Sequence, residues 1–304
     1  MGVENIRVKV TEVHRGEIIS FLDNKKIKIK IPRTLLNNHK EERNYVTVGD
    51  EIEIFFDKKA KRYLLIKRFE RFNQISRKDP FLSHISHVIA SNIDYLGLVI
   101  SLKNPDINWE LIDRYLITAD KYEIDVLLIL NKVDLLTENE IKELPVNTYK
   151  NLDIDIKLVS AKKNIGFDDL KNKIKNKVTL FSGPSGAGKS TILNLLDPTV
   201  LQKTSLVSQK DNRGRHTTRS TKLISLKDGG FIIDSPGVQD FSLDKINIDD
   251  IKKHYFDFYP YAEKCKYKNC LHQNEMICGV KDALKTKDIS ELRYNNYTNI
   301  MLSV

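Results

Sequence analysis

Residues 183–190 carry the glycines and side chains that bind nucleotide phosphates. The segment reads Gly-Pro-Ser-Gly-Ala-Gly-Lys-Ser and matches the phosphate-loop pattern G-x-x-x-x-G-K-S. Its glycines let backbone N–H groups turn toward a β-phosphate, and the helix that follows adds positive potential at its N-terminus. We expect Lys189 to reach the β- and γ-phosphates and the Ser190 hydroxyl to ligate Mg²⁺. The expected contacts are Gly183, Pro184, Ser185, Gly186, Ala187, Gly188, Lys189, Ser190 and Thr191.

A second phosphate-side motif follows 45 positions after Lys189. Residues 234–237 read Asp-Ser-Pro-Gly and match the pattern DxxG. We expect Asp234 to hold a water on Mg²⁺ and the Gly237 N–H to meet the γ-phosphate. Asp and Pro mark many turns, so the pattern alone is a weak signal. Its place after a phosphate loop and a predicted hairpin makes it a strong one.

The motif that would select a base precedes the phosphate loop. Residues 131–134 read Asn-Lys-Val-Asp and match NKxD, while residues 160–162 read Ser-Ala-Lys. A carboxylate such as Asp134 can accept from guanine N1–H and from the N2 amino group, which adenine lacks. Lys132 can pack its stem against the base. The expected base contacts are Asn131, Lys132, Val133, Asp134, Ser160, Ala161 and Lys162.

The order of these motifs differs from that of an ordinary small GTPase, in which NKxD comes last. Here NKxD comes first, so the DxxG segment that senses the γ-phosphate runs directly into the C-terminal tail. The rotated order predicts that the nucleotide state is passed to whatever the tail forms.

Residues 211–219 are polar, basic and without periodicity, as a switch loop should be. Thr217 or Thr218 is expected to close on Mg²⁺ when a γ-phosphate is present. Val238 follows Gly237, where ordinary small GTPases place a glutamine that positions water. We hypothesise that His216 enters the site instead or that a partner orders the loop; the alternative is that His216 only shapes the loop.

The three cysteines of the chain fall between residues 265 and 278 and share that segment with a histidine. Four N/S ligands within so short a stretch suit tetrahedral Zn²⁺ at a closed structural site. The ligands would be Cys265, Cys270, His272 and Cys278. Free thiols or a redox-metal cluster are the alternatives. The flanking Lys264, Lys266 and Lys268 would touch phosphate or form a solvated rim.

Composition indicates a soluble protein with basic character. The 304 residues suffice for two or three domains, and the net charge is +9, of which residues 1–72 contribute +6. A basic module suits polyanions, and nucleic acid is the first candidate, although a lysine-rich solubilising surface would look similar. No apolar run is long enough to span a bilayer, and no signal core opens the chain. We expect a cytoplasmic protein without a membrane partner, and a monomer.

Residues 1–72 predict a small β-barrel. The strand candidates are Arg7–His14, Gly16–Phe21, Lys25–Ile31, Glu51–Phe56 and Arg62–Phe69. Residues 25–31 alternate lysine with isoleucine, which turns one face inward and a lysine row outward. An OB-fold fits this pattern and would bind RNA, and an SH3-like barrel fits almost as well.

Residues 73–93 look like a connection, after which strands and helices alternate as in a doubly wound α/β sheet. The expected strands are Tyr95–Ser101, Val126–Leu130, Lys157–Ser160 and Val178–Ser182, with a hairpin of Thr221–Leu226 and Gly230–Asp234. Asn108 is expected to cap one helix, Ser190–Leu196 to form another, and residues 280–301 to form one or two closing helices.

These motifs together resemble one family closely: the circularly permuted ribosome small-subunit biogenesis GTPases, RsgA, also called YjeQ or YloQ. Residues 90–94 and the cysteine pattern fit it as well, whereas Asn212 replaces a glycine of its switch motif. The resemblance implies an OB-fold RNA-binding domain at 1–72, a permuted GTPase domain at 73–241 and a zinc-binding domain at 242–304. It also implies GTP hydrolysis stimulated by the 30S subunit, late maturation of that subunit, and rRNA binding.

Two rival hypotheses stay open from the sequence. The chain could be a nucleotide-gated RNA-binding scaffold with negligible turnover, which an assay of turnover with and without small subunits would separate. It could also be an ATP-dependent P-loop enzyme such as a small-molecule kinase, against which Asn131 and Asp134 argue.

Overall fold

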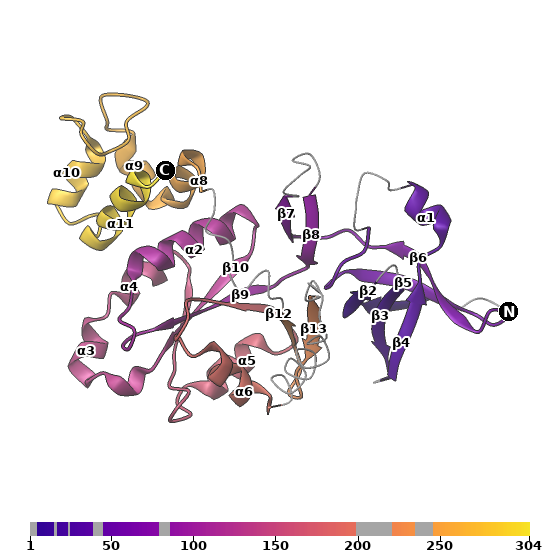
Figure 1. The fold of residues 1–304 in the computed structure, drawn as a ribbon. Helices are drawn as coiled ribbons and strands as arrows, with labels where there is room; N and C mark the ends of the chain where they lie inside the picture. Colours follow the sequence, from indigo (N-terminus) through magenta and orange to yellow (C-terminus); the bar gives the residue numbers. More distant parts are fainter. Residues whose placement is uncertain are drawn as a thin grey trace, which may run out of the picture. The chain divides into compact units, whose positions relative to one another are not determined.

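The computed structural model describes residues 5–14, 17–23, 25–38, 45–78, 86–198, 221–234 and 246–304 (Figure 1). His216, Thr217, Thr218, Gly237 and Val238 lie outside these ranges. The chain divides into two compact units. The first comprises Met1–Gly97, Phe167–Ser182 and Lys189–Asp240, and the second Leu98–Gly166, Gly183–Gly188 and Phe241–Val304.

The N-terminal strands of the first unit follow the order β1-β5-β6-β4-β3-β2. They are β1 (Ile6–Lys9), β2 (Glu12–His14), β3 (Glu17–Leu22), β4 (Lys25–Lys30), β5 (Glu51–Asp57) and β6 (Arg62–Arg68). Neighbours are antiparallel except β4 and β6, which run parallel. The residues packed between them include Ile18, Ile29, Ile52, Ile54 and Leu65. The alternating pattern therefore predicts both the strands and their buried face.

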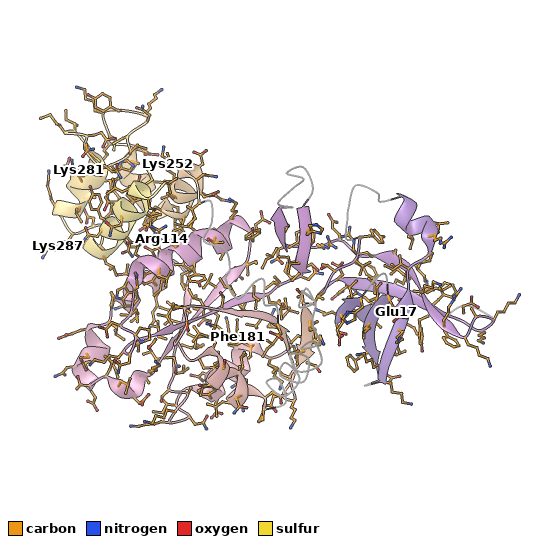
Figure 2. The ribbon with its side chains drawn as sticks, viewed as in Figure 1. Glu17, Arg114, Phe181, Lys252, Lys281 and Lys287 are labelled. Atoms are coloured by element: carbon orange, nitrogen blue, oxygen red, sulfur yellow. The ribbon has the colours of Figure 1, made fainter. Side chains whose placement is uncertain are left out.

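Three details of this region differ from the expectation. The predicted strand Arg7–His14 is two strands, because Val10 pairs with the backbone of Gly49 and Asp50 while Thr11 pairs with Ile19. A short helix, α1 (Arg33–Asn38), was not predicted. The lysine row of β4 is partly neutralised, since Lys26 lies 3.4 Å from Glu12 and Lys28 lies 3.0 Å from Glu17 (labelled in Figure 2).

The interpretation of residues 73–93 as a plain connection is wrong. Strands β7 (Gln74–Lys78) and β8 (Ser86–Ser91) form an antiparallel two-stranded sheet of their own. Ile75 and Ala90 face each other in register and are both buried. β7 has a single apolar residue and β8 has three in a row, so neither shows the alternation that identifies a strand from sequence.

The rest of the first unit carries the strand that leads into the phosphate loop. The strands β12 (Val178–Ser182), β13 (Lys222–Ser225) and β14 (Phe231–Asp234) accompany the helices α5 (Phe167–Ile174) and α6 (Lys189–Leu196). β13 and β14 form the predicted hairpin, whose turn uses Gly229 and Gly230 at φ +89° and +95°. β14 runs parallel to β12, and β13 pairs with β2 at Lys222 and Glu12, so β2-β13-β14-β12 are consecutive neighbours.

The second unit holds the parallel strands that carry the base motif. β9 (Tyr95–Ser101) contributes its last four residues, followed by β10 (Asp125–Asn131) and β11 (Asp155–Leu158) in parallel. Helix α2 (Trp109–Lys121) begins at the predicted cap, where Asn108 accepts from the Leu111 N–H at 3.0 Å. The short helices η1 (Val133–Leu135), α3 (Glu138–Glu143) and α4 (Val146–Lys150) lie between β10 and β11.

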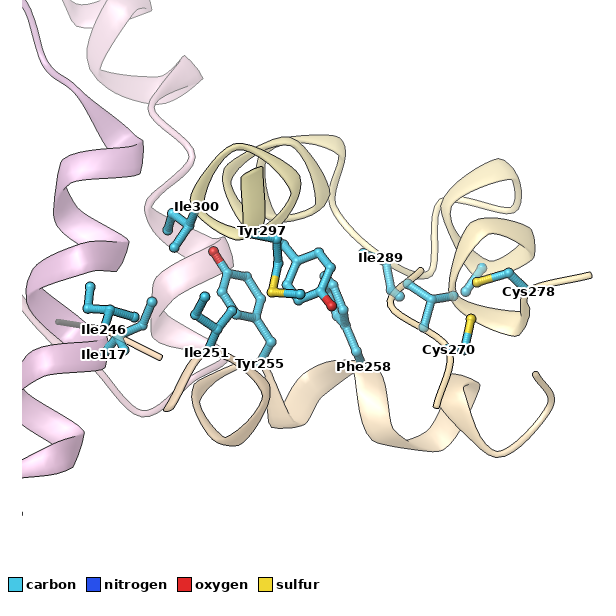
Figure 3. Close-up of a cluster of buried hydrophobic side chains, with 13 residues drawn as sticks. Ile117, Ile246, Ile251, Tyr255, Phe258, Cys270, Cys278, Ile289, Tyr297 and Ile300 are labelled. Carbon is cyan, nitrogen blue, oxygen red and sulfur yellow. The ribbon is translucent and has the colours of Figure 1, made fainter. Parts of the chain in front are cut away.

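The C-terminal part of the second unit is helical, as expected. It contains α8 (Ile248–His254), η2 (Phe256–Phe258), α9 (Tyr259–Ala262), α10 (Gly279–Lys285) and α11 (Glu291–Leu302). Its apolar cluster includes Ile117 of α2, which meets Ile246 and Ile251 (Figure 3). In the described ranges, no helix combines the length and apolarity that crossing a membrane requires.

Candidate nucleotide site and metal centre

One buried side chain joins the base motif to the phosphate loop. Asn131, the last residue of β10, is 2% exposed. Its Nδ2 donates to the Ala187 carbonyl at 2.9 Å, and its Oδ1 accepts from the Ala161 N–H at 3.1 Å. A single amide therefore bonds to the phosphate loop and to the Ser-Ala-Lys segment. The sequence places these three segments up to 56 residues apart.

The glycines of the phosphate loop are required by close backbone approach. Gly183 and Gly188 have φ values of +137° and +97°, in the region that favours glycine. A Cβ on Gly183 would lie 2.1 Å from the Val99 carbonyl oxygen. A Cβ on Gly188 would lie 2.3 Å from Nδ2 of Asn131. The loop can therefore pack against β9 and Asn131 only with glycine at both positions.

Asp134 is held in place by a serine of the second base segment. The Ser160 hydroxyl donates to Oδ1 of Asp134 at 2.6 Å and accepts from the Lys163 N–H at 3.1 Å. Ser160 is fully buried, whereas Asp134 is half-buried. Among the described residues, no donor is recorded for Oδ2 of Asp134. The carboxylate is thus oriented through one oxygen while the other stays open to a ligand.

The loop between β9 and α2 braces both ends of this site, a role that sequence reasoning missed. Lys132, which adopts φ +66°, donates its amine to the Asn104 carbonyl. Pro105 lies 3.5 Å from the position that a Cβ of Gly186 would occupy. The loop therefore contacts the base motif and the phosphate loop at once. The loop residues Lys103, Asn104 and Pro105 form no recognised motif, so the sequence alone does not reveal these contacts.

The same loop is tied to helix α3 through Lys103. Its amine lies 3.0 Å from the carboxylate of Glu140, which also accepts from the Thr137 N–H at 2.7 Å. Thr137 and Glu140 form a capping box at the start of α3. The Thr137 N–H, together with Lys103, lowers the pKa of Glu140 to about 2.

The remaining phosphate-side residues lie on the first unit. Lys189, Ser190 and Thr191 open helix α6, with Lys189 half-buried and the other two exposed. Asp234 ends β14, which runs parallel to β12 with Leu180 paired to Ile233. Because β12 and β14 run parallel in this register, Asp234 stands at the same sheet edge as Ser182, the last residue of β12. Val133, Lys162 and Ser185 lie on the second unit within their predicted segments.

The cysteines and the histidine converge as predicted. The ligand atoms of Cys265, Cys270, His272 and Cys278 all lie within 4.8 Å of one another. Sγ of Cys265 lies 3.8 Å from Sγ of Cys278, and Nδ1 of His272 lies 3.5 Å and 3.4 Å from these sulfurs. In a tetrahedral Zn²⁺ site, ordinary bond lengths separate two thiolate sulfurs by about 3.8 Å and a thiolate sulfur from an imidazole nitrogen by about 3.5 Å. The residues therefore fit a zinc ion. Figure 3 shows Cys270 and Cys278 with their sulfurs turned toward one another.

The backbone that carries the metal ligands is held from outside the motif. The Tyr294 hydroxyl donates to the His272 carbonyl at 2.7 Å, and the Tyr297 hydroxyl donates to the Leu271 carbonyl at 3.0 Å. The Glu275 carboxylate accepts from the N–H groups of Leu271 and Gln273. Helix α11 therefore fixes the ligand loop, a relationship that the spacing of the ligands does not predict.

A buried ion pair connects the C-terminal helices to α2. Arg293 of α11 and Asp113 of α2 are 1% and 0% exposed, and Nη1 of the arginine lies 3.1 Å from Oδ1 of the aspartate. The hydroxyl of Tyr255 and the amide of Asn296 each donate to Oδ2 of Asp113 at 2.8 Å. Burial opposes the charge of Arg293, but Asp113 outweighs it and raises the pKa of the guanidinium.

His254 of α8 belongs to this network. Its Nδ1 contacts the Asp120 carboxylate, and its Nε2 lies 3.3 Å from Nη1 of Arg293. Lys121 and Asp250 add an ion pair at the same interface, at 3.1 Å. The C-terminal helices and α2 are therefore joined by polar contacts around an apolar centre.

A parallel sheet with a phosphate loop after β12 and NKxD after β10 defines a P-loop nucleotide-binding protein with rotated motif order. A family model described as RsgA GTPase matches residues 68–244. The chain belongs to the RsgA GTPase family, which confirms the resemblance of the motifs and identifies the chain as a GTP hydrolase.

Two curated relatives span most of the chain. One, from Flavobacterium psychrophilum, is named small ribosomal subunit biogenesis GTPase RsgA. It is 39% identical over 262 residues, which cover 85% of this chain and 80% of that protein. Another, from Bacteroides thetaiotaomicron, is named small ribosomal subunit biogenesis GTPase RsgA 2 and is 36% identical over 85% of this chain and 84% of its own length.

Two crystal structures share the fold. YjeQ from Thermotoga maritima matches with a TM-score of 0.76 and 26% identity over 99% of this chain and 98% of that one. YloQ, described as a circularly permuted GTPase, matches with a TM-score of 0.73 and 24% identity over 99% and 95%. These likenesses support the rotated order of the GTPase motifs.

Proposed function

We propose that this chain hydrolyses GTP to GDP and phosphate during late maturation of the small ribosomal subunit. The observation that carries the proposal is the Asn131 amide, which bonds at once to the segment expected at the base and to the loop expected at the phosphates. One purine triphosphate then spans Asp134 at one end and residues 183–188 at the other. The names of the relatives supply the ribosomal assignment.

Recognition of guanine rests on the oriented carboxylate of Asp134. Ser160 occupies Oδ1, so the second oxygen is directed to the base. Lys132, braced by Asn104, lies along the base plane, and Asn131 keeps the base segment and the phosphate loop together. An ATP-dependent enzyme would have no use for a fixed carboxylate at this edge.

On the phosphate side, Lys189 contacts the β- and γ-phosphates, and Ser190 and Asp234 hold Mg²⁺ directly and through water. Bound Mg²⁺ would neutralise charge that develops between the β- and γ-phosphates. Gly237 and one of Thr217 and Thr218 would register the γ-phosphate. Because Val238 cannot orient water, His216 or an ordering partner supplies that geometry.

The tail and the N-terminal strands provide contacts with rRNA. The N-terminal strands form the OB-fold module, and its +6 charge suits phosphate binding. One structural Zn²⁺, held by Cys265, Cys270, His272 and Cys278, would fix the C-terminal loop. The protein acts as a monomer on the 30S subunit, and GTP hydrolysis releases it.

The test is the GTPase rate of the full chain with added 30S, 50S or 70S particles. Unaided turnover should be about 10⁻⁴ to 10⁻² s⁻¹, as in small GTPases that lack an activator. Only particles containing a small subunit should raise it, and 30S most strongly. Stimulation by 50S alone would contradict the assignment.

A matched variant separates base recognition from turnover. Asp134→Asn should shift the binding preference from guanine to xanthine nucleotides. With xanthosine triphosphate as substrate, 30S particles should again stimulate hydrolysis by this variant. Unchanged guanine preference would remove Asp134 from the base site.

The rival hypothesis of a scaffold with negligible turnover is one against which membership of the GTPase family argues. In that case the GTP form would bind 30S, but 30S would leave the rate unchanged. The assay above gives opposite results for the two candidates.

A further inference from the structure

A cavity of about 150 Å³ lies in the C-terminal part of the chain, and two of the expected metal ligands, Cys270 and His272, form part of its lining. Three buried rings, Tyr255, Phe258 and Tyr297, line it, with centroids 5.1–5.3 Å apart (Figure 3). The hydroxyl of Tyr255 is bonded to Asp113 and that of Tyr297 to a backbone carbonyl. Since both hydroxyls are engaged elsewhere, these tyrosines offer the cavity mainly aromatic carbon.

The rim of the cavity combines aromatic rings with positive charge. Tyr259 and Tyr267 are each 50% exposed, and Lys252 (labelled in Figure 2) and Lys268 complete the rim. None of the lining residues is acidic. Across the part of the chain that the structure describes, neither lysine has a carboxylate within salt-bridge distance. The rim therefore offers two cations and two half-exposed rings to a ligand.

The volume limits the occupant to one flat ring system. Pockets for whole small molecules measure about 300–1,000 Å³, well above this cavity. A protein cavity of about 150 Å³ accepts a single benzene ring. The two lysines favour a ligand that carries anionic groups beside the ring. A nucleobase between two backbone phosphates has this combination, whereas an aromatic residue of a peptide brings no charge of its own.

We propose that this cavity takes an unstacked nucleobase of single-stranded RNA, with the adjoining phosphates at Lys252 and Lys268. The inference rests on the proposed function, in which the C-terminal part contacts rRNA. Bases in a duplex are stacked and unavailable, so the ligand is a loop, a bulge or a chain end. Stacking on tyrosine tolerates any base, because every base has a π face.

The experiment measures fluorescence anisotropy with the full-length, zinc-loaded protein in saturating GDP, which blocks the GTP site. The probes are a labelled uridine octamer and an octamer of abasic ribose phosphates with the same charge. Wild-type protein should bind the uridine chain about tenfold more tightly. Tyr259→Ala and Tyr267→Ala should bring the ratio of the two dissociation constants toward one and leave binding of the abasic probe unchanged. Tyr259→Phe, which keeps the aromatic ring, should retain the tenfold ratio.

The chain offers matched controls. Phe256 is 49% exposed but does not line the cavity, so Phe256→Ala should keep the full ratio. Lys252→Ala should weaken binding of both probes more than Lys253→Ala, since Lys253 lies next in sequence but outside the cavity. If Phe256→Ala lost the preference for the uridine probe as fully as the two tyrosine variants, the cavity would not be the binding site.

The outcomes distinguish the inference from the proposed function. Equal binding of both probes by wild-type protein would overturn the base pocket while leaving RNA binding in place. Binding of neither probe would instead contradict the proposed RNA contact. Photo-crosslinking of wild-type protein to a 4-thiouridine oligomer needs no variant. Adducts at Tyr259 or Tyr267 are expected, and adducts confined to other segments would overturn the proposal.

Discussion

Asn131 shows how one residue can serve two ends of a ligand site. Motif matching assigns it to the base, yet its amide is already bonded to Ala187 of the phosphate loop and to Ala161. Gly188 has no room for a Cβ because this amide lies beside it. The NKxD asparagine and the last glycine of the phosphate loop are therefore one packing unit.

The first prediction removes that amide. Asn131→Ala leaves the Ala187 carbonyl and the Ala161 N–H unpaired in a buried place, at a cost of about 1–3 kcal/mol each. We expect affinity for both GDP and GTP to fall by about tenfold or more, together with a lower melting temperature. Equilibrium titration with a fluorescent guanine nucleotide measures the affinity, and a thermal melt measures the stability. Asn139→Ala, at an exposed position of α3, is the control and should bind normally. Unchanged affinity in the Asn131 variant would remove its bridging role.

A second prediction concerns the pH response of Glu140. Its folded pKa is about 2, below the ordinary value of 4.5, because the Thr137 N–H and Lys103 favour its charged form. A lowered folded pKa adds stability above pH 4.5, and this stability is lost as pH falls from 4.5 toward 2. Glu140→Gln should therefore lower the melting temperature at pH 7, and the difference from wild type should shrink below pH 4.5. Thermal melts between pH 7 and pH 3 test this. A difference that stays constant across the range would contradict it.

At the scale of elements, helix α2 is the element against which the C-terminal helices pack. Asp113 and Arg293 are buried with their charges paired, and the ring of Tyr255 lies under the guanidinium at 3.9 Å. Burial and Asp113 also raise the pKa of Tyr255, so its hydroxyl stays a hydrogen-bond donor. The contact therefore combines charge, hydrogen bonds and aromatic packing in one place.

The third prediction breaks this pair. Arg293→Met leaves the Asp113 charge buried without a cation and should destabilise the chain by about 3–5 kcal/mol. The double variant Arg293→Met with Asp113→Asn removes both charges and should regain a large part of that loss. Tm values of the single and double variants, followed by circular dichroism, give the comparison. Additive losses would mean that the two residues act independently.

Sequence reasoning succeeded where a pattern repeats or a motif is short. The strands with alternating or continuous apolar residues, the cap at Asn108 and the convergence of the three cysteines with His272 needed only local information. It failed where structure depends on distant partners. The sequence around Asp113 does not predict its ion pair with Arg293, which is 180 positions away. Strands β7 and β8 form by pairing with each other, so neither is recognisable alone. The loop at Lys103–Pro105 is connected to the candidate site only through its contacts with Lys132, Glu140 and Gly186.

At the scale of the whole molecule, the loop that carries the three cysteines and His272 is tied to the long C-terminal helix. Tyr294 and Tyr297 of α11 hold the backbone of the ligand loop, and the same helix carries Arg293 to α2. Loss of the metal would therefore be expected to loosen α11 and, through it, the contact with α2. Segments with too little apolar core of their own depend on metal to fold.

The fourth prediction tests this dependence. Cys270→Ser and Cys278→Ser should each reduce bound zinc from about one ion per chain toward none, measured by elemental analysis. Hydrogen exchange should show faster exchange in α11 and in α2, while β3 and β4 stay protected. Asn269→Ala, at an exposed position next to a ligand, should keep its zinc. Full zinc content in both cysteine variants would mean that the cluster is not the metal site.

The grip on α2 gives the tail two connections to the nucleotide. One is covalent, since the chain runs on from Asp234 on the phosphate side into residues 246–304. The other passes through α2, which leads within a few residues to β10 and Asn131 of the proposed base motif. Under the proposed function, a force applied to the tail by a large bound particle would thus act on both the base motif and the phosphate motif. Such a particle could adjust retention of the purine and cleavage of the terminal phosphate with a single displacement.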